Sequence, residues 1–386
     1  MSDPPTSAST FLDDPPEFHE KLLDDGDRPY WSPDGARIAL VEKNLGDVCE
    51  IDLESREVKN LTRDNGAYHN FLRVLFLPNG NYLLIGSKQF DKAEESRFGR
   101  AEVWIMDKNA SSPPKPLGRS IFQGCAVSTV SLRIAYSVHE KIGPSTGAPE
   151  DLEIRVGDIE GSCGTSILVD KKVVYRTRNG RCPEPQVLRH VHSKIIFAEY
   201  VSRFPRCNSL DWQTVVKGIE VVSGVVRTYI GEHLTHNEPE GIFPPGEHIC
   251  LESSCDFGNY WPPIDPWKLK LDGTSRGVRM TRAIEHSPWR CSSSNVSPDG
   301  RWLVFMVNTR RDGSGSGSGL GLFELEKLDQ SGPAQAWQSR TCDTTRLSRI
   351  SACSRIACSS LEGYPAGRGA ATSRSPAPSE CRPPAG

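Results

Sequence analysis

The sequence predicts an all-β fold: a single six-bladed β-propeller with four-stranded antiparallel blades, followed by a disordered C-terminal tail. Three observations on the 386 residues lead to this prediction. A turn containing proline and glycine, set between two short apolar segments, recurs along the chain. Its copies lie roughly 50 residues apart, a period typical of propeller blades. No segment shows a long hydrophobic period of the helical type.

Four copies of the turn are clear. The first is Trp31-Ser-Pro-Asp-Gly35, which precedes Arg37–Leu40, and the last is Val296-Ser-Pro-Asp-Gly300, which precedes Trp302–Phe305. The other two clear copies are Phe76–Gly80 and Phe243–Gly246. Proline presets φ for the turn, and Gly takes the positive φ that closes a short hairpin. Each copy therefore predicts the first two strands of a blade.

Two degenerate copies fill the long gap between the second and fifth turns. Leu132–Tyr136 follows Ser131, and Lys194–Phe197 follows His192, in the way that Arg37–Leu40 follows its glycine. The six turn positions are then 45 to 61 residues apart, which sets the number of blades at six.

Alternating apolar and polar residues predict the outer strands of the blades. They are expected at Asp47–Leu53 and Glu57–Thr62, Glu102–Asp107 and Lys115–Leu117, Leu152–Val156 and Lys172–Tyr175, Gly218–Val222 and Val225–Tyr229, Trp267–Leu271 and Gly277–Thr281, and Leu320–Leu325. The sixth blade has no clear fourth strand after Leu325. The alternative is that residues near the N-terminus supply this fourth strand, although Phe18–Leu23 is predicted to form a short helical turn.

Both ends of the chain differ in composition from the repeats. Residues 1–20 are rich in Pro, Asp and Ser and are predicted to be a mobile N-terminal segment. The propeller is expected to span 21–329. Residues 330–386 are rich in Ser, Ala, Pro, Gly and Arg and carry few aromatic residues. Such a segment buries too little apolar area to offset its chain entropy, so it is predicted to be disordered or not selected to fold.

Composition excludes several classes of protein. The net charge of −3 and the pI of about 6.3, with Lys and Arg spread along the chain, argue against nucleic acid as a partner. There is no apolar run of about 18 residues and no secretory signal, which argues against a membrane partner. The twelve cysteines are dispersed without a CxxC pair and are expected to be free thiols. A reducing, cytoplasmic location is predicted.

The repeated unit resembles a known family. With Ile51–Leu53 and Asn60–Thr62 behind the first hairpin, it is similar to the WD40-like (PD40) propeller repeat of TolB-type proteins, over about residues 25–328. Propellers of this repeat type include periplasmic binding modules, the non-catalytic domain of prolyl-peptidase-like enzymes, and lyases acting on oligogalacturonate. The resemblance implies the fold and leaves the function open. The lyase group would imply a His/Gln metal cluster, but no ligand can be assigned to a position of this chain.

The candidate site follows from the predicted fold. The innermost strand of each blade lines the central channel, and the loop that leads into that strand (the lead-in loop) opens on one face. The lead-in loops are predicted at Asp25–Tyr30, Asp64–Asn70, Phe122–Ala126, Arg181–Val187, His233–Gly241 and Glu285–Asn295. The candidate ligand-binding residues in them are His69, Glu184, Gln186, His236, Glu238, Glu240, His286 and Arg290.

Imidazoles and carboxylates are groups that bind divalent metals or form acid/base pairs. Each of these side chains has a structural alternative, which is a hydrogen bond to turn backbone. His190 and His192, two residues apart, form a further candidate metal pair. No G-x-S-x-G motif is present, which argues against a complete prolyl peptidase.

Three functions remain. The first is a ligand-binding or interaction propeller that uses its lead-in face for a small molecule, a saccharide or a peptide. The second is an enzyme, with lyase-type chemistry as the first expectation, whose His/Glu residues hold a divalent metal or form an acid/base pair. The third is a scaffold that docks a protein partner through an exposed apolar patch.

Overall fold

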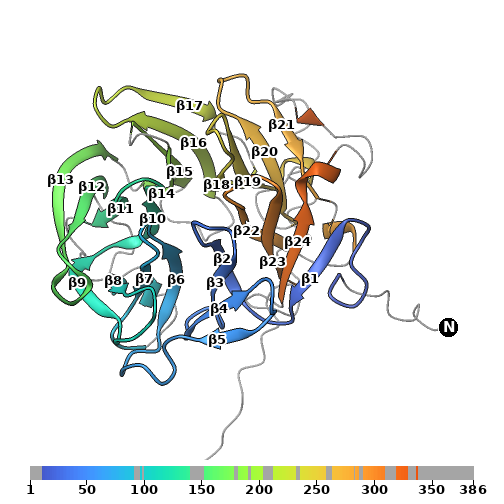
Figure 1. Cartoon of the computed structure of the whole chain (residues 1–386). Coiled ribbons are helices and arrows are strands. Elements are labelled where there is room, and N and C mark those ends of the chain that lie inside the picture. The colour runs from blue at the N-terminus through green and yellow to red at the C-terminus, as the bar shows by residue number, and fades with distance from the viewer. Residues whose placement is uncertain are drawn as a thin grey trace, which may run out of the picture. The chain divides into compact units, whose positions relative to one another are not determined.

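The computed structural model describes residues 11–90, 96–97, 100–139, 152–177, 181–189, 193–202, 212–231, 235–257, 263–281, 283–286, 290–308, 319–328 and 336–337. Contacts divide the chain into two units, Met1–Ser339 and Arg340–Gly386, and all the described residues belong to the first. Six antiparallel sheets surround a common centre in this unit (Figure 1), which confirms the predicted six-bladed propeller.

Each blade has four main strands, with the first at the centre and the fourth toward the periphery (Figure 1), and a short fifth strand is added to the sheet of blade 5. Blade 1 consists of β2 (Asp27–Trp31), β3 (Arg37–Val41), β4 (Val48–Asp52) and β5 (Val58–Asn60). Blade 2 consists of β6 (Phe71–Phe76), β7 (Tyr82–Gly86), β8 (Glu102–Met106) and β9 (Lys115–Ser120). Blade 3 consists of β10 (Phe122–Val127), β11 (Arg133–His139), β12 (Leu152–Glu160) and β13 (Ile167–Arg176). Blades 4 and 5 are β14 (Cys182–Arg189), β15 (Lys194–Ser202), β16 (Trp212–Glu220) and β17 (Val226–Ile230); and β18 (Asn237–Ile242), β19 (His248–Ser253), β20 (Asp265–Lys270) and β21 (Gly277–Arg279). Short 3-10 helices lie at Cys163–Thr165, Cys255–Phe257, Ala283–Glu285 and Leu325–Lys327.

Blade 6 closes the ring with the N-terminal part of the chain. It consists of β22 (Arg290–Val296), β23 (Trp302–Asn308), β24 (Gly319–Glu324) and β1 (His19–Leu23). The pairing of β1 with β24 runs from His19 opposite Phe323 to Leu23 opposite Leu320. The predicted helical turn at Phe18–Leu23 is therefore wrong, because these residues find ladder partners at the free edge of β24. Of the two sources left open for the last strand, the N-terminal one is correct.

The recurring turns join the first two strands of each blade. In blade 1 the Ser32 N–H donates to the Arg37 carbonyl (2.9 Å), and Gly35 takes a φ of 73°. In blade 6 the same bonds join Ser297 and Trp302, and Gly300 takes a φ of 75°. Only Gly adopts such a φ without strain, which explains its place in the turn. His192, in the degenerate turn of blade 4, lies outside the described residues, as does His190.

The core is divided among the interfaces between blades. Each of the six larger clusters of buried apolar residues joins two neighbouring sheets; one of them packs Ile38 of blade 1 against Val304 of blade 6. Adjacent blades thus pack face to face, and each blade depends on both neighbours. Six of the described cysteines are free thiols, five of them buried.

Little of the C-terminal segment is described. Ala336–Trp337 forms a two-residue strand, β25, which pairs with Gly277 and Val278 at the outer edge of blade 5. The rest of the predicted tail, 330–386, lies outside the described residues. Among those described, no helix has the length and apolar character needed to cross a membrane.

Candidate functional site

The innermost strands of blades 4 and 5 carry most of the candidate site. Glu184 and Gln186 lie two residues apart on β14, as do Glu238 and Glu240 on β18. In both strands the pairing register shifts at the second of these residues, Gln186 or Glu240. Their segments were predicted to be lead-in loops from their position in the repeat, and they contain Pro183, Pro185 and Pro239. The structure has strands there instead. An innermost strand has one free edge, and proline is tolerated on such an edge strand.

Arg73 of β6 connects these two strands from across the channel. Its guanidinium donates a hydrogen bond to the Gln186 side-chain oxygen and forms an ion pair with Glu240 (3.2 Å). Arg73 is 8% exposed, so the pair is shielded from water. Blades 2, 4 and 5 therefore meet through polar side chains in the centre of the propeller.

Gln186 extends this network. Its amide nitrogen donates to Glu184 (3.0 Å) and to Glu238 (2.9 Å). Since its oxygen accepts from Arg73, the amide is satisfied at both ends and its orientation is fixed. We call Arg73, Glu184, Gln186, Glu238 and Glu240 the channel network.

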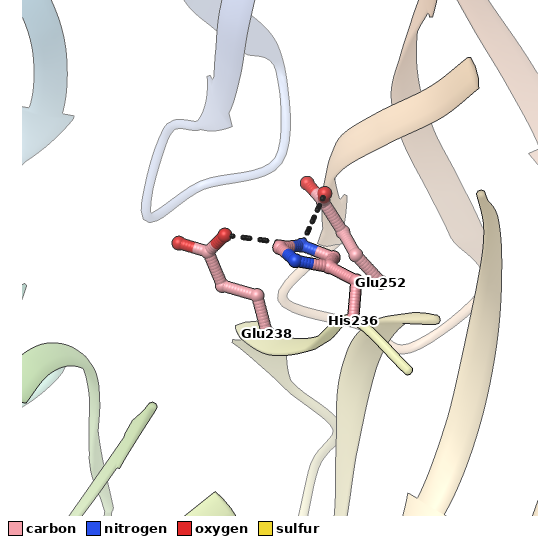
Figure 2. A group of neighbouring side chains, drawn as sticks. All are labelled: His236, Glu238 and Glu252. Carbon is pink, nitrogen blue, oxygen red and sulfur yellow. Dashed lines mark ion pairs between the residues drawn. The ribbon is translucent and has the colours of Figure 1, made fainter. Parts of the chain in front are cut away.

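His236 lies at one end of the channel network. The carboxylates of Glu238 and Glu252, a residue of β19, lie on either side of its imidazole (Figure 2), at 3.4 and 3.7 Å from Nε2. The backbone holds the imidazole in place, because the His236 N–H donates to Ser254 Oγ (3.0 Å) and its carbonyl accepts from the Ser254 N–H (3.2 Å).

Burial and pairing set the ionisation of these groups. Burial opposes the charged imidazole, but the two carboxylates outweigh it and raise the pKa of His236 to about 9. Burial would likewise raise the pKa of Glu238, yet His236 lowers it to about 2. Glu240 behaves differently: burial, with only partial compensation by Arg73, raises its pKa well above the usual value. The charged pair of His236 and Glu238 therefore lies near Glu240, whose carboxylate is compensated only in part by Arg73.

Other guanidinium groups face the same space. Arg28 of β2 donates to the Leu72 carbonyl (3.3 Å), and burial lowers its pKa to about 10. Arg290 of β22 donates to the Asn308 side chain (3.1 Å), and burial lowers its pKa, with Glu252 acting in the opposite direction. Cationic groups therefore come from blades 1, 2 and 6. Carboxyl groups come from blades 4 and 5 and, with the buried Asp27, from blade 1.

The structure brings together five of the eight candidate residues: Glu184, Gln186, His236, Glu238 and Glu240. Arg290 is buried close enough to feel the charges of Glu252 and Glu238. His69 is 43% exposed and pairs with Asp47 (2.8 Å) at the boundary of blades 1 and 2. His286 lies beside the N-terminal segment, where its carbonyl accepts from the Phe11 N–H (3.0 Å).

Two residues of the site, Arg73 and Glu252, were not predicted from the sequence. Arg73 is the one charge in the otherwise apolar strand Phe71–Phe76, a signal that could have identified it. Glu252 lies on β19, the second strand of blade 5, outside the predicted lead-in loops. Arg28, in the first predicted lead-in loop, was expected from the sequence as the polar residue that blade 1 contributes.

A cavity of about 340 Å³ lies at the other end of the innermost strands, where the recurrent hairpins turn. We call it the hairpin-end cavity. Its wall includes the residue that precedes the turn in each blade: Trp31, Phe76, Val127, Leu188, Ile242 and Val296. Its inner lining includes Tyr30, Gln186, Glu240 and Asn295, and its rim includes the exposed Val130. The sequence predicted the binding site on the opposite, lead-in face, where 233–234 and 287–289 of the predicted loops lie outside the described residues.

The His236 group has the donor set of a metal site. One ligand atom from each of His236, Glu238 and Glu252 lies within 4.8 Å of the others. Ligands around a transition metal or Ca²⁺, bound at about 2.0–2.5 Å, are themselves about 3–5 Å apart, so the spacing fits. A metal would have to displace the proton held on His236.

Comparisons with known proteins assign the chain to no family. No protein-family model and no curated protein matches the chain. Similar solved structures include hydrazine synthase from Kuenenia stuttgartiensis (11% identity, 77% of this chain and 82% of that chain, TM-score 0.48) and TolB from Acinetobacter baumannii (12%, 79% and 67%, 0.44). Another is oligogalacturonate lyase from Vibrio parahaemolyticus (9%, 78% and 78%, 0.44). At these identities and TM-scores the similarity concerns the propeller fold and assigns no activity, and membership of the PD40 family stays a prediction.

Proposed function

We propose that the protein is a binding propeller that takes a small molecule into its central channel. The observation that carries this proposal is the hairpin-end cavity, whose floor residues Gln186 and Glu240 belong to the channel network. A volume of about 340 Å³, apolar walls and a few convergent polar groups are the usual features of a small-molecule site.

Stability alone gives little reason for the channel network. Desolvating paired charges costs as much as their attraction returns, and apolar side chains of similar volume are often at least as stabilising. Yet Arg73 and His236 are buried, and Glu238 is partly buried, at the centre of the propeller, where apolar residues could pack. A role in recognition accounts for their presence. The cavity volume favours a small molecule over the saccharide or peptide that the sequence also allowed.

Narrowing the mouth of the cavity tests this function. Val130→Trp places a large side chain on the rim, and Val222→Trp makes the same change at an 87% exposed position on the outer hairpin of blade 4. We expect a general fragment library, screened by ligand-observed NMR, to contain molecules that bind the wild type and Val222→Trp but not Val130→Trp. Equal binding of every fragment by both variants would remove the support for a channel site.

A second candidate function is favoured by the His236 group. Three metal-ligating atoms converge there next to Glu240, a carboxyl group whose raised pKa suits a general acid. With a divalent metal on His236, Glu238 and Glu252, the protein would be an enzyme in which the metal polarises a bound substrate.

Metal binding separates the two candidates. We expect an enzyme of this type to bind close to one equivalent of Mn²⁺ or Zn²⁺ by calorimetry, to lose it in His236→Ala, and to keep it in His69→Ala. Because the metal displaces a proton from a group with a pKa of about 9, its affinity should rise about tenfold per pH unit up to that pH. Identical metal uptake by the wild type and His236→Ala would eliminate this candidate while leaving ligand binding in the hairpin-end cavity intact.

A further inference from the structure

Four polar residues of the inner lining lie where two cavities meet. A second cavity, of about 20 Å³, adjoins the hairpin-end cavity on the side away from the turns. Tyr30, Gln186, Glu240 and Asn295 line both cavities, and we call them the floor residues. A ligand in the hairpin-end cavity would find its polar partners among these four.

Two of the floor residues are already engaged within the protein. The Gln186 amide is bonded at both ends, and Glu240 is ion-paired with Arg73 (3.2 Å). The nearby charges also offset one another. Arg28 interacts with the carboxyl groups of Asp27 and Glu240, and Arg73 interacts with several carboxyl groups of blades 4 and 5. A charged ligand would have to compete with these buried pairs, so the floor favours an uncharged one.

The other two floor residues, Asn295 and Tyr30, have unused hydrogen-bonding groups. Asn295 is 8% exposed, and its side-chain amide bonds to no residue that the structure describes. The Tyr30 hydroxyl likewise has no partner among the described residues. Burial raises the pKa of Tyr30 to about 12, so this hydroxyl stays protonated and can donate. Buried polar groups without partners are costly, and a ligand that bonds to them removes that cost.

A shared backbone feature places these two side chains. The pairing register shifts just before Tyr30 in β2 and just before Asn295 in β22. Two residues ahead of each, Arg28 and Ser293 take φ values of 50° and 49°, which are uncommon for residues other than Gly. Such β-bulges redirect the side chains that follow them. The Trp31 indole then ties the two strands together by donating to the Asn295 carbonyl (3.1 Å).

The polar character at this level of the channel is confined to blades 1 and 6. Tyr30 and Asn295 each stand one residue before the ring of apolar residues that precede the turns. The residues at the equivalent position of blades 2 to 5 have no polar side chain: Leu75, Ala126, Val187 and Gly241. A ligand would therefore have one polar edge, on the side of blades 1 and 6, and an otherwise apolar body.

The Asn295 amide indicates what this polar edge contains. It presents a carbonyl acceptor and an N–H donor side by side, so it forms two hydrogen bonds with a group of the same pattern. An N–H next to a carbonyl on one edge, as in a lactam or cyclic imide, has that pattern. A carboxylate offers acceptors alone, an ammonium group offers donors alone, and an ester or lactone lacks the donor.

We propose that the channel binds an uncharged cyclic amide, with its N–H and carbonyl on the Asn295 amide, the Tyr30 hydroxyl donating to the same carbonyl, and its apolar body inside the ring of residues that precede the turns. This inference rests on the proposed small-molecule function and adds its chemical class.

Three bicyclic probes of similar shape test the ligand class. They are 2-quinolone, coumarin, in which a ring oxygen replaces the N–H, and 2-naphthoate, titrated calorimetrically into the full chain at pH 7. We expect 2-quinolone to bind at least tenfold more tightly than either of the others, because only its edge satisfies both halves of the Asn295 amide. Coumarin or 2-naphthoate binding as tightly as 2-quinolone, with binding lost in Val130→Trp, would overturn the ligand class and leave the proposed function standing. If none of the three binds in the channel, the inferred class is wrong, and the fragment comparison of Val130→Trp with Val222→Trp judges the proposed function separately.

Variants of the two floor residues test the position of the amide. Asn295→Leu removes the amide at similar size, Tyr30→Phe removes the hydroxyl alone, and Asn109→Leu, at an exposed outer turn of blade 2, is the matched control. We expect Asn295→Leu to weaken 2-quinolone at least tenfold and coumarin less than threefold. Tyr30→Phe should weaken both by a similar factor, since both carry the carbonyl, and Asn109→Leu should change neither. Unchanged affinity for 2-quinolone in a folded Asn295→Leu protein would overturn the assignment. Should that variant not fold, the ratio of 2-quinolone to coumarin affinity in the wild type decides.

Discussion

Protonation of His236 contributes to the stability of the folded protein. Its imidazole lies between the carboxylates of Glu238 and Glu252, and its pKa rises to about 9 from the ordinary value of 6.5. A group whose pKa is higher in the folded state stabilises the fold while it is protonated. That stabilisation is complete below about pH 6.5 and is lost as the pH rises through about 9. At about 1.4 kcal/mol per pKa unit, the contribution at low pH is on the order of 3 kcal/mol.

This pH dependence can be measured in a variant. We expect His236→Gln to lower the free energy of unfolding at pH 6.5 by about 2–4 kcal/mol, because it leaves two buried carboxylates without their cation. At pH 10 the difference from the wild type should shrink, since the wild-type imidazole is then neutral. Urea unfolding of both proteins at the two pH values, with His69→Gln as a control for the loss of an imidazole, gives the comparison. A difference in the free energy of unfolding that grows with pH would contradict a protonated His236 between the two carboxylates.

The recurrent hairpin is the unit at the scale of elements. In blade 1 the Ser32 hydroxyl accepts from the Arg37 N–H (2.9 Å), and Asp34 accepts from the Ala36 N–H (3.1 Å). In blade 6 Ser297 and Asp299 make the same bonds, to Trp302 (2.9 Å) and Arg301 (3.0 Å). Blade 2 has Leu77 at the serine position and closes its turn through backbone bonds. The serine therefore strengthens a hairpin that can form without it.

Replacing this serine should weaken the fold without preventing it. We expect Ser32→Ala and Ser297→Ala each to cost about 1–2 kcal/mol, because each leaves a turn N–H without its side-chain acceptor. Ser55→Ala, which alters a peripheral exposed turn of the same blade, should cost less than half as much. Thermal unfolding of the three variants provides the test. If Ser32→Ala and Ser55→Ala unfold at the same temperature, the Ser32 hydroxyl does not stabilise the turn.

At the scale of the whole molecule, the stability of the propeller depends on how its ring is closed. The β1 strand completes blade 6, and Phe11, ahead of it, is buried against Phe305 with ring centroids 5.6 Å apart. In each of the other five blades the four main strands are consecutive in sequence. Blade 6 alone joins residues from opposite ends of the propeller, so β1 holds the ring shut.

Removing β1 should destabilise every blade. A chain lacking residues 1–23 exposes the edge of β24 and the apolar surface under Phe11, which favours opening and aggregation. We expect its Tm to fall by at least about 10 °C and a synthetic peptide of residues 11–25 to recover part of the loss. A truncated protein that melts like the full chain would show that blade 6 is stable with three strands.

The sequence revealed repeating features better than singular ones. The turns at Gly35, Gly80, Gly246 and Gly300 located four blades, because local chemistry alone specifies a hairpin. The β1 strand escaped prediction, since a short segment without a turn motif depends for its conformation on a partner some 300 residues away.

The same distinction applies to the candidate site. Glu184 and Gln186, or Glu238 and Glu240, could be paired from their spacing of two. The contact of Arg73 with Gln186 joins residues 113 apart and follows only from the radial arrangement of blades. The end of the channel that holds the cavity was also unpredictable, because the residues before the turns form a ring only once the six blades surround one axis.

A crystal structure of the protein soaked with the fragments that bind the wild type tests the central claim most directly. We expect a fragment inside the hairpin-end cavity, surrounded by the apolar residues that precede the turns, with its polar end within hydrogen-bond distance of Tyr30, Gln186, Glu240 or Asn295. Fragments bound at full occupancy only outside the channel, with the cavity filled by ordered water alone, would contradict a ligand-binding role for the centre of this propeller.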